Sequence, residues 1–209
     1  MNAGAANAPE IVAVLGVTGA GKTTWLKRTL LTPRPRRLLV WNFGPVNEYR
    51  DYGHELPLGE LVAEGAAAGA RLPFGLTFNA SVDPVRRERE FAVFCTLAFR
   101  LGNLTMLVEE LRFVTRASWA PVPWQRCILL GRKVGLRIIG TSQRPAHIDK
   151  DFLGNATRLH TGLLNYRDDV ATVANELSVP PEEIAGLALL DWIDFDRRTR
   201  QLTRGRVAF

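Results

Sequence analysis

The sequence has few cysteines and no long hydrophobic run, and each shortage argues against a class of protein. Its two cysteines, Cys95 and Cys127, lie among apolar neighbours, so we expect the buried, reduced thiols of a cytosolic protein and no disulfide framework. No apolar run approaches the roughly 20 residues of a membrane-spanning helix, so we expect no transmembrane segment. The N-terminal residues have neither a basic start nor an apolar core, so we expect no signal peptide.

Lysine is also scarce, because only four of the 27 basic residues are lysines and the other 23 are arginines. The formal net charge is +6. This basic balance favours a polyanionic partner such as nucleic acid. An arginine-biased genome with an ordinary solvated surface would give the same counts, so charge alone leaves both readings open.

Length and composition predict one α/β domain. The chain has 209 residues, of which 46% are hydrophobic and 23% are charged, enough for a sizeable core. No internal repeat or low-complexity tract interrupts it. We therefore predict a flexible tail at residues 1–9 and a single domain over residues 10–209.

The most informative stretch begins with an apolar run at residues 11–15, typical of a strand that is buried on both faces. Gly16 to Thr23 then match the phosphate-binding loop GxxxxGK[ST] in full, and residues 25–31 follow with helical spacing. A glycine-rich turn with a chance Lys-Thr pair is the alternative. The strand before and the helix after favour the motif, because they are the context that it requires.

The chemistry of such a loop explains its spacing. Glycines let successive backbone N–H groups surround a phosphate, and the following helix directs its positive end at the same anion. We expect Lys22 to reach the β- and γ-phosphates of ATP and the Thr23 hydroxyl to bind Mg²⁺. The predicted nucleotide-binding residues are Gly16, Val17, Thr18, Gly19, Ala20, Gly21, Lys22, Thr23 and Thr24.

The remaining pattern alternates strands and helices. Predicted strands cover residues 38–42, 72–79, 104–110, 136–141 and 158–164. Predicted helices cover residues 56–70, 84–101, 124–133 and 168–177, and residues 178–184 are a predicted helix entry with Ser178 or Val179 near the cap. Residues 189–195 and 199–209 form a predicted C-terminal hairpin.

The strand at residues 104–110 ends in two carboxylates, Glu109 and Glu110. In nucleotide hydrolases an acidic residue at such a strand end holds Mg²⁺, and a second one orients or deprotonates the attacking water. We assign Glu109 to Mg²⁺ and Glu110 to the water. Two surface glutamates at a strand end are the alternative. Gln143 follows the next strand and is predicted to reach the γ-phosphate, although it fits a solvated loop equally well.

Taken together, these motifs resemble the FtsK–HerA group of DNA-translocating ATPases. The most specific likeness is Gly131-Arg132-Lys133-Val134-Gly135, followed by a strand and Ser142-Gln143-Arg144-Pro145. The resemblance implies a RecA-like P-loop NTPase with a mostly parallel central sheet flanked by helices. Two departures are Glu109, where the group commonly has aspartate, and Asn42, where it often has an acidic residue.

Within that group the chain looks most like the genome-packaging ATPases of tailless viruses that contain an internal membrane. This likeness implies a pentameric or hexameric homo-oligomeric ring that acts on double-stranded DNA, with capsid or viral membrane vertex proteins as further partners. It also implies a place in the host cytoplasm or on the virion.

By the same resemblance, Arg132 is the arginine that reaches the nucleotide of a neighbouring subunit, where a guanidinium stabilises charge on the transferring phosphoryl group. Alternatively, Arg132 only stabilises the C-terminus of its helix. Arg144 is then the other candidate for the arginine that reaches the neighbouring nucleotide, the arginine finger. Basic clusters that could contact DNA phosphates comprise Arg86, Arg87, Arg89, Arg112 and Arg116. A solvated helix face explains each cluster equally well.

The predicted function is ATP hydrolysis coupled to translocation of double-stranded DNA, with packaging of a viral genome into a preformed capsid as its purpose. Two other functions stay open. One is a P-loop phosphotransferase or nucleotide-dependent switch, although we find no clear arginine-rich lid of the kind that a kinase carries. The other is an assembly factor that binds ATP in order to dock on a capsid or membrane.

Overall fold

The computed structural model describes residues 9–69 and 72–208. It divides into two compact units, each of which we describe by itself. Unit one contains residues Pro33–Glu109 and Ala120–Ile139, and unit two contains residues Ile11–Thr32, Glu110–Trp119 and 140–208. Apart from Pro9, the predicted flexible tail lies outside the described residues.

The strands of unit one are parallel. Their order is β3-β4-β2-β5, with bounds β2 Arg37–Asn42, β3 His54–Glu55, β4 Phe74–Asn79 and β5 Leu104–Val108. Every residue of β2 and β5 is buried, which explains their nearly continuous apolar runs. Trp41 of β2 faces Val108 of β5 and Phe78 of β4 in the register, so the carboxyl ends of these strands meet at one edge.

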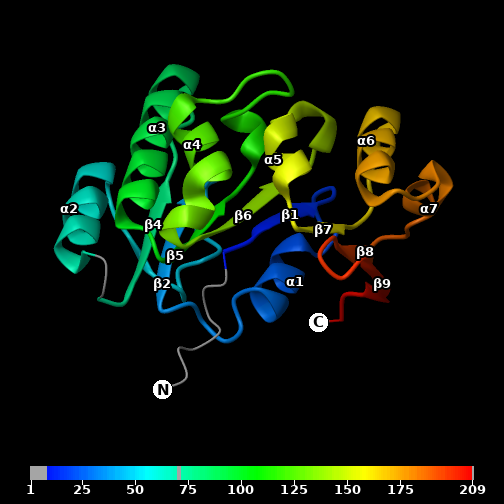
Figure 1. Ribbon diagram of the computed structural model, residues 1–209, viewed down its shortest axis with the longest axis horizontal. Coiled ribbons are helices and arrows are strands. Elements are labelled where there is room, and N and C mark those ends of the chain that lie inside the picture. Colours follow the sequence, from blue (N-terminus) through cyan, green and yellow to red (C-terminus); the bar gives the residue numbers. More distant parts are fainter. Residues whose placement is uncertain (1–8, 70–71, 209) are drawn as a thin grey trace. The chain divides into compact units, whose positions relative to one another are not determined.

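Three helices cover unit one, with α3 between α2 and α4 (Figure 1). Their bounds are α2 Leu58–Ala68, α3 Pro84–Leu101 and α4 Val122–Leu130, and the 3₁₀ helix η3 (Gly131–Val134) follows α4 directly. Asp83 caps α3 by accepting a hydrogen bond from the Arg86 N–H at 2.7 Å, and Gly102 is the C-cap after the last helical residue, Leu101. Phe91 and Phe94 of α3 pack edge-on against Trp41 of the sheet.

Unit two holds the other strands and the C-terminal hairpin. β1 (Ile11–Leu15) pairs in parallel with β7 (Arg158–Thr161), β8 (Asp191–Asp196) is antiparallel to β7, and β9 (Gln201–Arg206) is antiparallel to β8. Helices α1 (Lys22–Thr29) and α5 (Lys150–Asn155) both contact β1 and lie on opposite sides of it (Figure 1). Helix α6 (Arg167–Leu177) packs on the short α7 (Pro181–Ala185).

The structure confirms the α/β class, the mostly parallel strands and the C-terminal hairpin. Strand β6 (Leu136–Ser142) contributes residues to both units. The helix entry predicted at residues 178–184 is present as α7, but Ser178 lies before its cap and ends α6 in the left-handed conformation, with φ of 56°. Pro180 is the N-cap of α7 instead, because Pro181 has a fixed φ suited to the first helical position.

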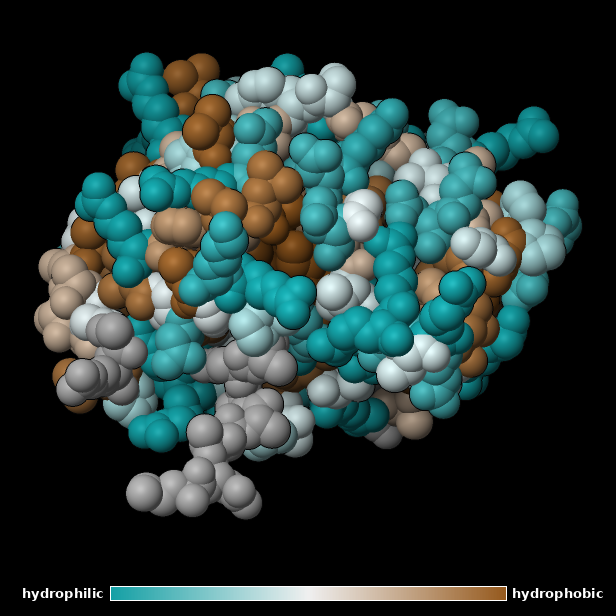
Figure 2. Space-filling model, viewed as in Figure 1, coloured by the Kyte–Doolittle hydropathy of each residue, from teal (hydrophilic) through white to brown (hydrophobic). Residues whose placement is uncertain are grey.

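None of the helices in the described part of the chain combines the length and apolar composition needed to cross a membrane. Hydrophilic side chains cover much of the face seen in Figure 2, and hydrophobic ones gather over α4. The exposed large apolar residues of α4 are Val122, Leu129 and Leu130.

A close backbone approach in unit one gives a test of the fold. A Cβ on Gly75 would lie 2.1 Å from the Tyr52 carbonyl oxygen, and backbone cannot move aside as a side chain can. We expect Gly75→Ala to lower the free energy of unfolding by about 1–3 kcal/mol. Gly59→Ala is the matched control, because a Cβ there meets nothing within 4 Å. Urea unfolding of both variants checks this, and equal stabilities would contradict the packing of β4.

Candidate active site

The loop after β1 has a backbone that requires its glycines. Gly16, Gly19 and Gly21 have φ of 140°, 79° and 84°, a region that residues with side chains rarely adopt. The Gly16 N–H donates to the Ser142 carbonyl at 3.1 Å, and the Val17 N–H donates to the Leu163 carbonyl at 2.9 Å. These bonds fix the start of the loop against the end of β6 and the chain after β7.

Helix α1 starts at Lys22, with Gly21 as its N-cap and no capping side chain. An uncapped helix start that follows a curled glycine loop is a ready site for a phosphate. The Lys22 ammonium donates to the carbonyls of Gly16 and Val17 at 2.8 and 3.1 Å, so it lies across the loop. Thr23 sits half-buried in the first turn of α1, next to Lys22.

A chain of hydrogen bonds in unit two joins three segments that the sequence singled out separately. The Thr18 hydroxyl of the loop donates to Gln143 Oε1 at 3.0 Å. The other end of the same amide, Gln143 Nε2, donates to Glu110 Oε1 at 2.8 Å. The structure therefore brings together the glycine loop, the second acidic residue Glu110, and Gln143, whose amide is predicted to reach the γ-phosphate.

Glu110 has a strained backbone. Its φ of 51° and ψ of 59° are left-handed, which costs a residue with a side chain about 1–3 kcal/mol. Its N–H donates to the Thr141 hydroxyl at 3.1 Å, which helps to hold this conformation. Glu110 Oε2 lies 3.5 Å from Arg112 Nε and accepts no hydrogen bond within the described residues. This second oxygen is thus placed to accept a proton from a water.

Glu109 belongs to unit one and is fixed there. Its N–H donates to the Trp41 carbonyl at 2.9 Å, which places the residue directly after β5. Its Oε1 accepts a hydrogen bond from the Tyr49 hydroxyl at 2.7 Å, and Tyr49 is fully buried. The sequence offered one hint of this contact, a tyrosine in the loop that leaves the strand beside β5, but it did not identify the pair.

The two candidate finger arginines have different surroundings. Arg132 is exposed on η3 of unit one. Arg144 is held within its own chain, because its Nε donates to fully buried Asp169 at 2.7 Å and its guanidinium lies 3.8 Å from the centre of the Tyr166 ring. An arginine anchored in this way is a poor candidate for reaching another subunit, so the geometry favours Arg132 over Arg144.

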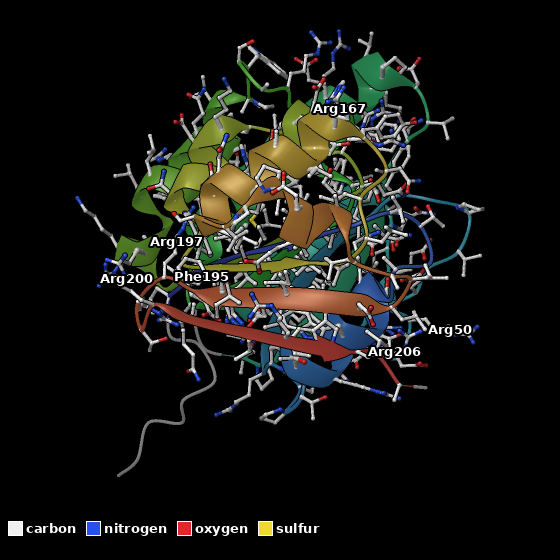
Figure 3. The ribbon with its side chains drawn as sticks, turned by 90° about the vertical axis from the view of Figure 1, so that its right-hand side faces the viewer. Arg50, Arg167, Phe195, Arg197, Arg200 and Arg206 are labelled. Atoms are coloured by element: carbon white, nitrogen blue, oxygen red, sulfur yellow. The ribbon has the colours of Figure 1, made fainter. Side chains whose placement is uncertain are left out.

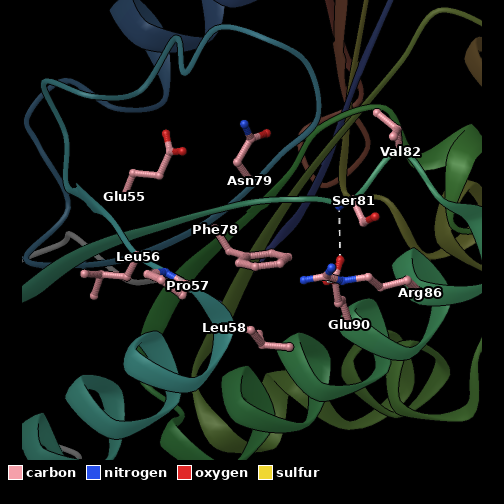
Figure 4. A pocket seen from close by; sticks show the side chains of 10 residues that line it. All are labelled: Glu55, Leu56, Pro57, Leu58, Phe78, Asn79, Ser81, Val82, Arg86 and Glu90. Carbon is pink, nitrogen blue, oxygen red and sulfur yellow. Dashed lines mark hydrogen bonds and ion pairs between the residues drawn. The ribbon is translucent and has the colours of Figure 1, made fainter.

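The arginines predicted to contact DNA also differ, and Arg86, Arg87, Arg112 and Arg116 have partners within the chain. Arg86 forms a 2.7 Å ion pair with Glu90 at the rim of a cleft of about 530 Å³ (Figure 4). Arg87 is buried and donates to the carbonyls of Ser81 and Val82, which does not favour a surface role.

The loop after Glu110 carries the other predicted DNA contacts. Arg112 lies against the Phe113 ring and faces Glu110. Arg116 and Trp119 exchange backbone hydrogen bonds of 2.8 and 3.0 Å and are both exposed. Together with Arg89, which is exposed on α3, Arg116 is therefore an accessible member of the predicted set.

A buried stack of aromatic rings joins α1 to strand β7. His160 of β7 stacks on Trp25 of α1, with ring centres 3.6 Å apart, and Trp192 of β8 lies 5.6 Å away. Burial lowers the pKa of His160 well below its ordinary 6.5, and the nearby Arg158 charge lowers it further. The imidazole is therefore neutral in the folded protein at pH 7.

No protein-family model matches the chain. It is 27% identical over 179 residues to Protein P9 of Pseudoalteromonas phage PM2, a match that covers 83% of this chain and 78% of that protein. Among solved structures, it superposes on the genome-packaging NTPase B204 of Sulfolobus turreted icosahedral virus 2, in complex with sulfate, with a TM-score of 0.79. That match covers 97% of this chain and 98% of B204 at 13% identity.

The bacterial conjugative coupling protein TrwBdeltaN70 also matches, with a TM-score of 0.67 and 13% identity over 97% of this chain and 85% of that one. A second B204 structure, in complex with AMPPCP, gives a TM-score of 0.77. These matches confirm the fold that the motifs predicted, and at 13% identity the likeness to B204 and TrwBdeltaN70 is a likeness of fold.

The neutral His160 predicts a loss of stability in acid. Above pH 6.5 both folded and unfolded states carry a neutral imidazole, so it has no effect there. As the pH falls below 6.5, only the unfolded state takes up the proton, and stability drops by up to about 1.4 kcal/mol per pH unit until the folded pKa is reached. We expect His160→Phe, which keeps a ring against Trp25, to remove this part of the slope.

Urea unfolding between pH 7.5 and 5 measures the effect. The control is His54→Phe, the same substitution at an exposed position. An equal acid slope in wild type and His160→Phe would show that the folded protein takes up the proton as readily as the unfolded chain.

Proposed function

We propose that the chain is an ATPase that translocates double-stranded DNA and packages a viral genome into a preformed capsid. The observation that carries this proposal is the hydrogen-bond chain from Thr18 through Gln143 to Glu110, since it joins the phosphate loop to a carboxylate and a sensor amide. The fold shared with a genome-packaging NTPase supports the biological setting.

The loop fits a triphosphate. Its three glycines have the positive φ that a curled phosphate-binding backbone requires, and Lys22 lies across the same loop. When ATP binds, Lys22 exchanges the carbonyls of Gly16 and Val17 for the β- and γ-phosphates. A phosphate is the better partner because the interaction then joins opposite charges.

The available donors also fit Mg²⁺. The Thr23 hydroxyl and the Glu109 carboxylate supply oxygen ligands, which Mg²⁺ prefers. No group of three or more histidine, cysteine or acidic residues suited to a metal lies within residues 9–69 and 72–208. That suits an ion held by few protein atoms and by substrate phosphates. Bound Mg²⁺ would neutralise charge on those phosphates.

Hydrolysis then depends on Glu110 and Gln143. Glu110 orients and deprotonates the attacking water through the oxygen that Gln143 does not occupy. Gln143 bonds both Thr18 and Glu110, so a γ-phosphate that competes for its amide changes both contacts. Its amide can thereby report whether the γ-phosphate is present.

In the proposed ring of five or six copies, Arg132 completes the site of a neighbouring copy. It is exposed on η3, directly after α4, whose last residues Leu129 and Leu130 are 59% and 39% exposed. Exposed apolar residues beside an exposed arginine suit a face that another subunit covers. Arg86, Arg89 and Arg116 are the exposed candidates for DNA phosphates, and capsid or membrane vertex proteins would anchor the ring.

Removal of either charged group of the site tests the chemistry. We expect Lys22→Ala and Glu110→Gln each to reduce the steady-state ATPase rate at least about 100-fold. Glu110→Gln keeps the acceptor for Gln143 but loses the base, so its nucleotide affinity should persist. Glu88→Gln, at an exposed position of α3, is the control. Full activity in Lys22→Ala or Glu110→Gln would reject this mechanism.

Repeating the ATPase measurement with and without double-stranded DNA tests whether hydrolysis is coupled to DNA. The DNA should raise the wild-type rate of phosphate release if hydrolysis is coupled to translocation. Slow, DNA-independent turnover with tight nucleotide binding would instead favour an assembly factor, and phosphoryl transfer to an acceptor would favour a kinase.

Mixing two inactive variants tests whether the site is shared between copies. We expect Arg132→Ala to lose about 1,000-fold in rate, because the transition-state charge loses its guanidinium. A mixture of Arg132→Ala and Lys22→Ala should regain activity, since the intact arginine of one copy then meets the intact loop of the other. Lys133→Ala is the control for charge at η3. Without any recovery in the mixture, Arg132 would not act in trans.

A further inference from the structure

We propose that Tyr49 is a positioning residue for Glu109, a role that rests on the proposed function. The Tyr49 hydroxyl donates to Glu109 Oε1 at 2.7 Å, and the tyrosine has no exposed surface. A buried tyrosine hydroxyl normally has a hydrogen-bond partner. Here the partner is the carboxylate assigned to Mg²⁺.

The loop after β2 holds Tyr49 rigidly. The Tyr49 N–H donates to the Asn47 side-chain oxygen at 2.9 Å, and its carbonyl accepts from the Tyr52 N–H at 2.8 Å. The Tyr52 ring packs edge-on against the Tyr49 ring, with centres 6.4 Å apart. Its peptide groups and its ring are thus both held by contacts within the loop, which restricts where the hydroxyl can lie.

The length of the glutamate side chain explains why a positioning hydrogen bond is needed. This side chain has one more rotatable bond than aspartate, so a carboxylate at the end of β5 has more orientations to choose from. Because the backbone N–H of Glu109 is fixed to the Trp41 carbonyl, the Tyr49 hydroxyl restricts the remaining freedom at the other end. Outer hydrogen bonds of this kind orient the ligands of metal sites.

Asn42 does not compete for this role. Its amide nitrogen donates to Asn79 Oδ1 at 3.1 Å and to the Val46 carbonyl at 3.3 Å. It thereby braces the carboxyl ends of β2 and β4 and the loop that follows β2. The residue of this loop that bonds the Glu109 carboxylate is Tyr49.

The test is Tyr49→Phe, which removes one oxygen and keeps the buried ring. Its primary readout is nucleotide binding rather than activity: the affinity for a fluorescent ADP with and without Mg²⁺. We expect affinity without Mg²⁺ to equal that of wild type, and the tightening caused by Mg²⁺ to fall about 10-fold. The kcat for ATP should fall about 10- to 100-fold. Tyr52→Phe is the matched control and should behave as wild type in both assays.

A double-mutant cycle with Glu109→Gln separates positioning from general support of the fold. If Tyr49 acts through the carboxylate, Tyr49→Phe should change nothing further in the Glu109→Gln background. Equal losses in both backgrounds, or wild-type behaviour of Tyr49→Phe, would overturn the proposal. Failure of the wild-type protein itself to bind or hydrolyse ATP would reject the proposed function instead, so the two failures are distinct.

Discussion

The two-sided amide of Gln143 is the interaction on which the candidate site depends. An ionised glutamate can only accept hydrogen bonds, and the Thr18 hydroxyl bonds here as a donor, so a side chain that both accepts and donates is needed between them. Because each end of the amide has a different partner, its orientation is fixed by chemistry. The same bond gives the strained Glu110 a partner at its carboxylate, while Thr141 holds its backbone.

Many of the arginines that give the chain its positive charge act inside the fold. Arg37 is buried, which lowers its pKa, and it donates to the carbonyls of Asn103, Leu72 and Gly69. Arg197 lies at one end of the C-terminal hairpin (Figure 3). It donates to the carbonyls of Leu153, Gly154 and Ala156 at the C-terminal end of α5. The arginine count therefore overstates the charge offered to a polyanion, and exposure is the better guide.

Local rules explain what could be predicted from the sequence. The glycine loop, the cap at Asp83 and the apolar strands each depend on residues close in sequence. Strand β3 has two residues and α5 has six, so neither has enough length to show a period. The contacts of Tyr49 and Arg144 could not be predicted. The partner of Tyr49 lies 60 positions away in the sequence and that of Arg144 lies 25 positions away, so only the folded chain brings them together.

The C-terminal hairpin carries no recognised motif, yet the segment that follows β9 contacts the glycine loop at Gly21 and helix α1 at Arg28. Val207, just after β9, lies 2.8 Å from where a Cβ on Gly21 would be, so Gly21 is required by space as well as by its φ of 84°. Arg28 of α1 also bonds the Ala208 carbonyl.

Further back, Trp192 of the hairpin faces His160, which stacks on Trp25 of α1. The same tryptophan leaves no room for a side chain at Gly205, because a Cβ there would lie 2.3 Å from its ring. The C-terminal segment thus contacts α1 directly at its N-cap, through Val207, and indirectly on its buried side, where Trp192 packs on His160. Since Val207 packs against Gly21 at the start of α1, this segment without a recognised motif helps to define the space around the glycine loop.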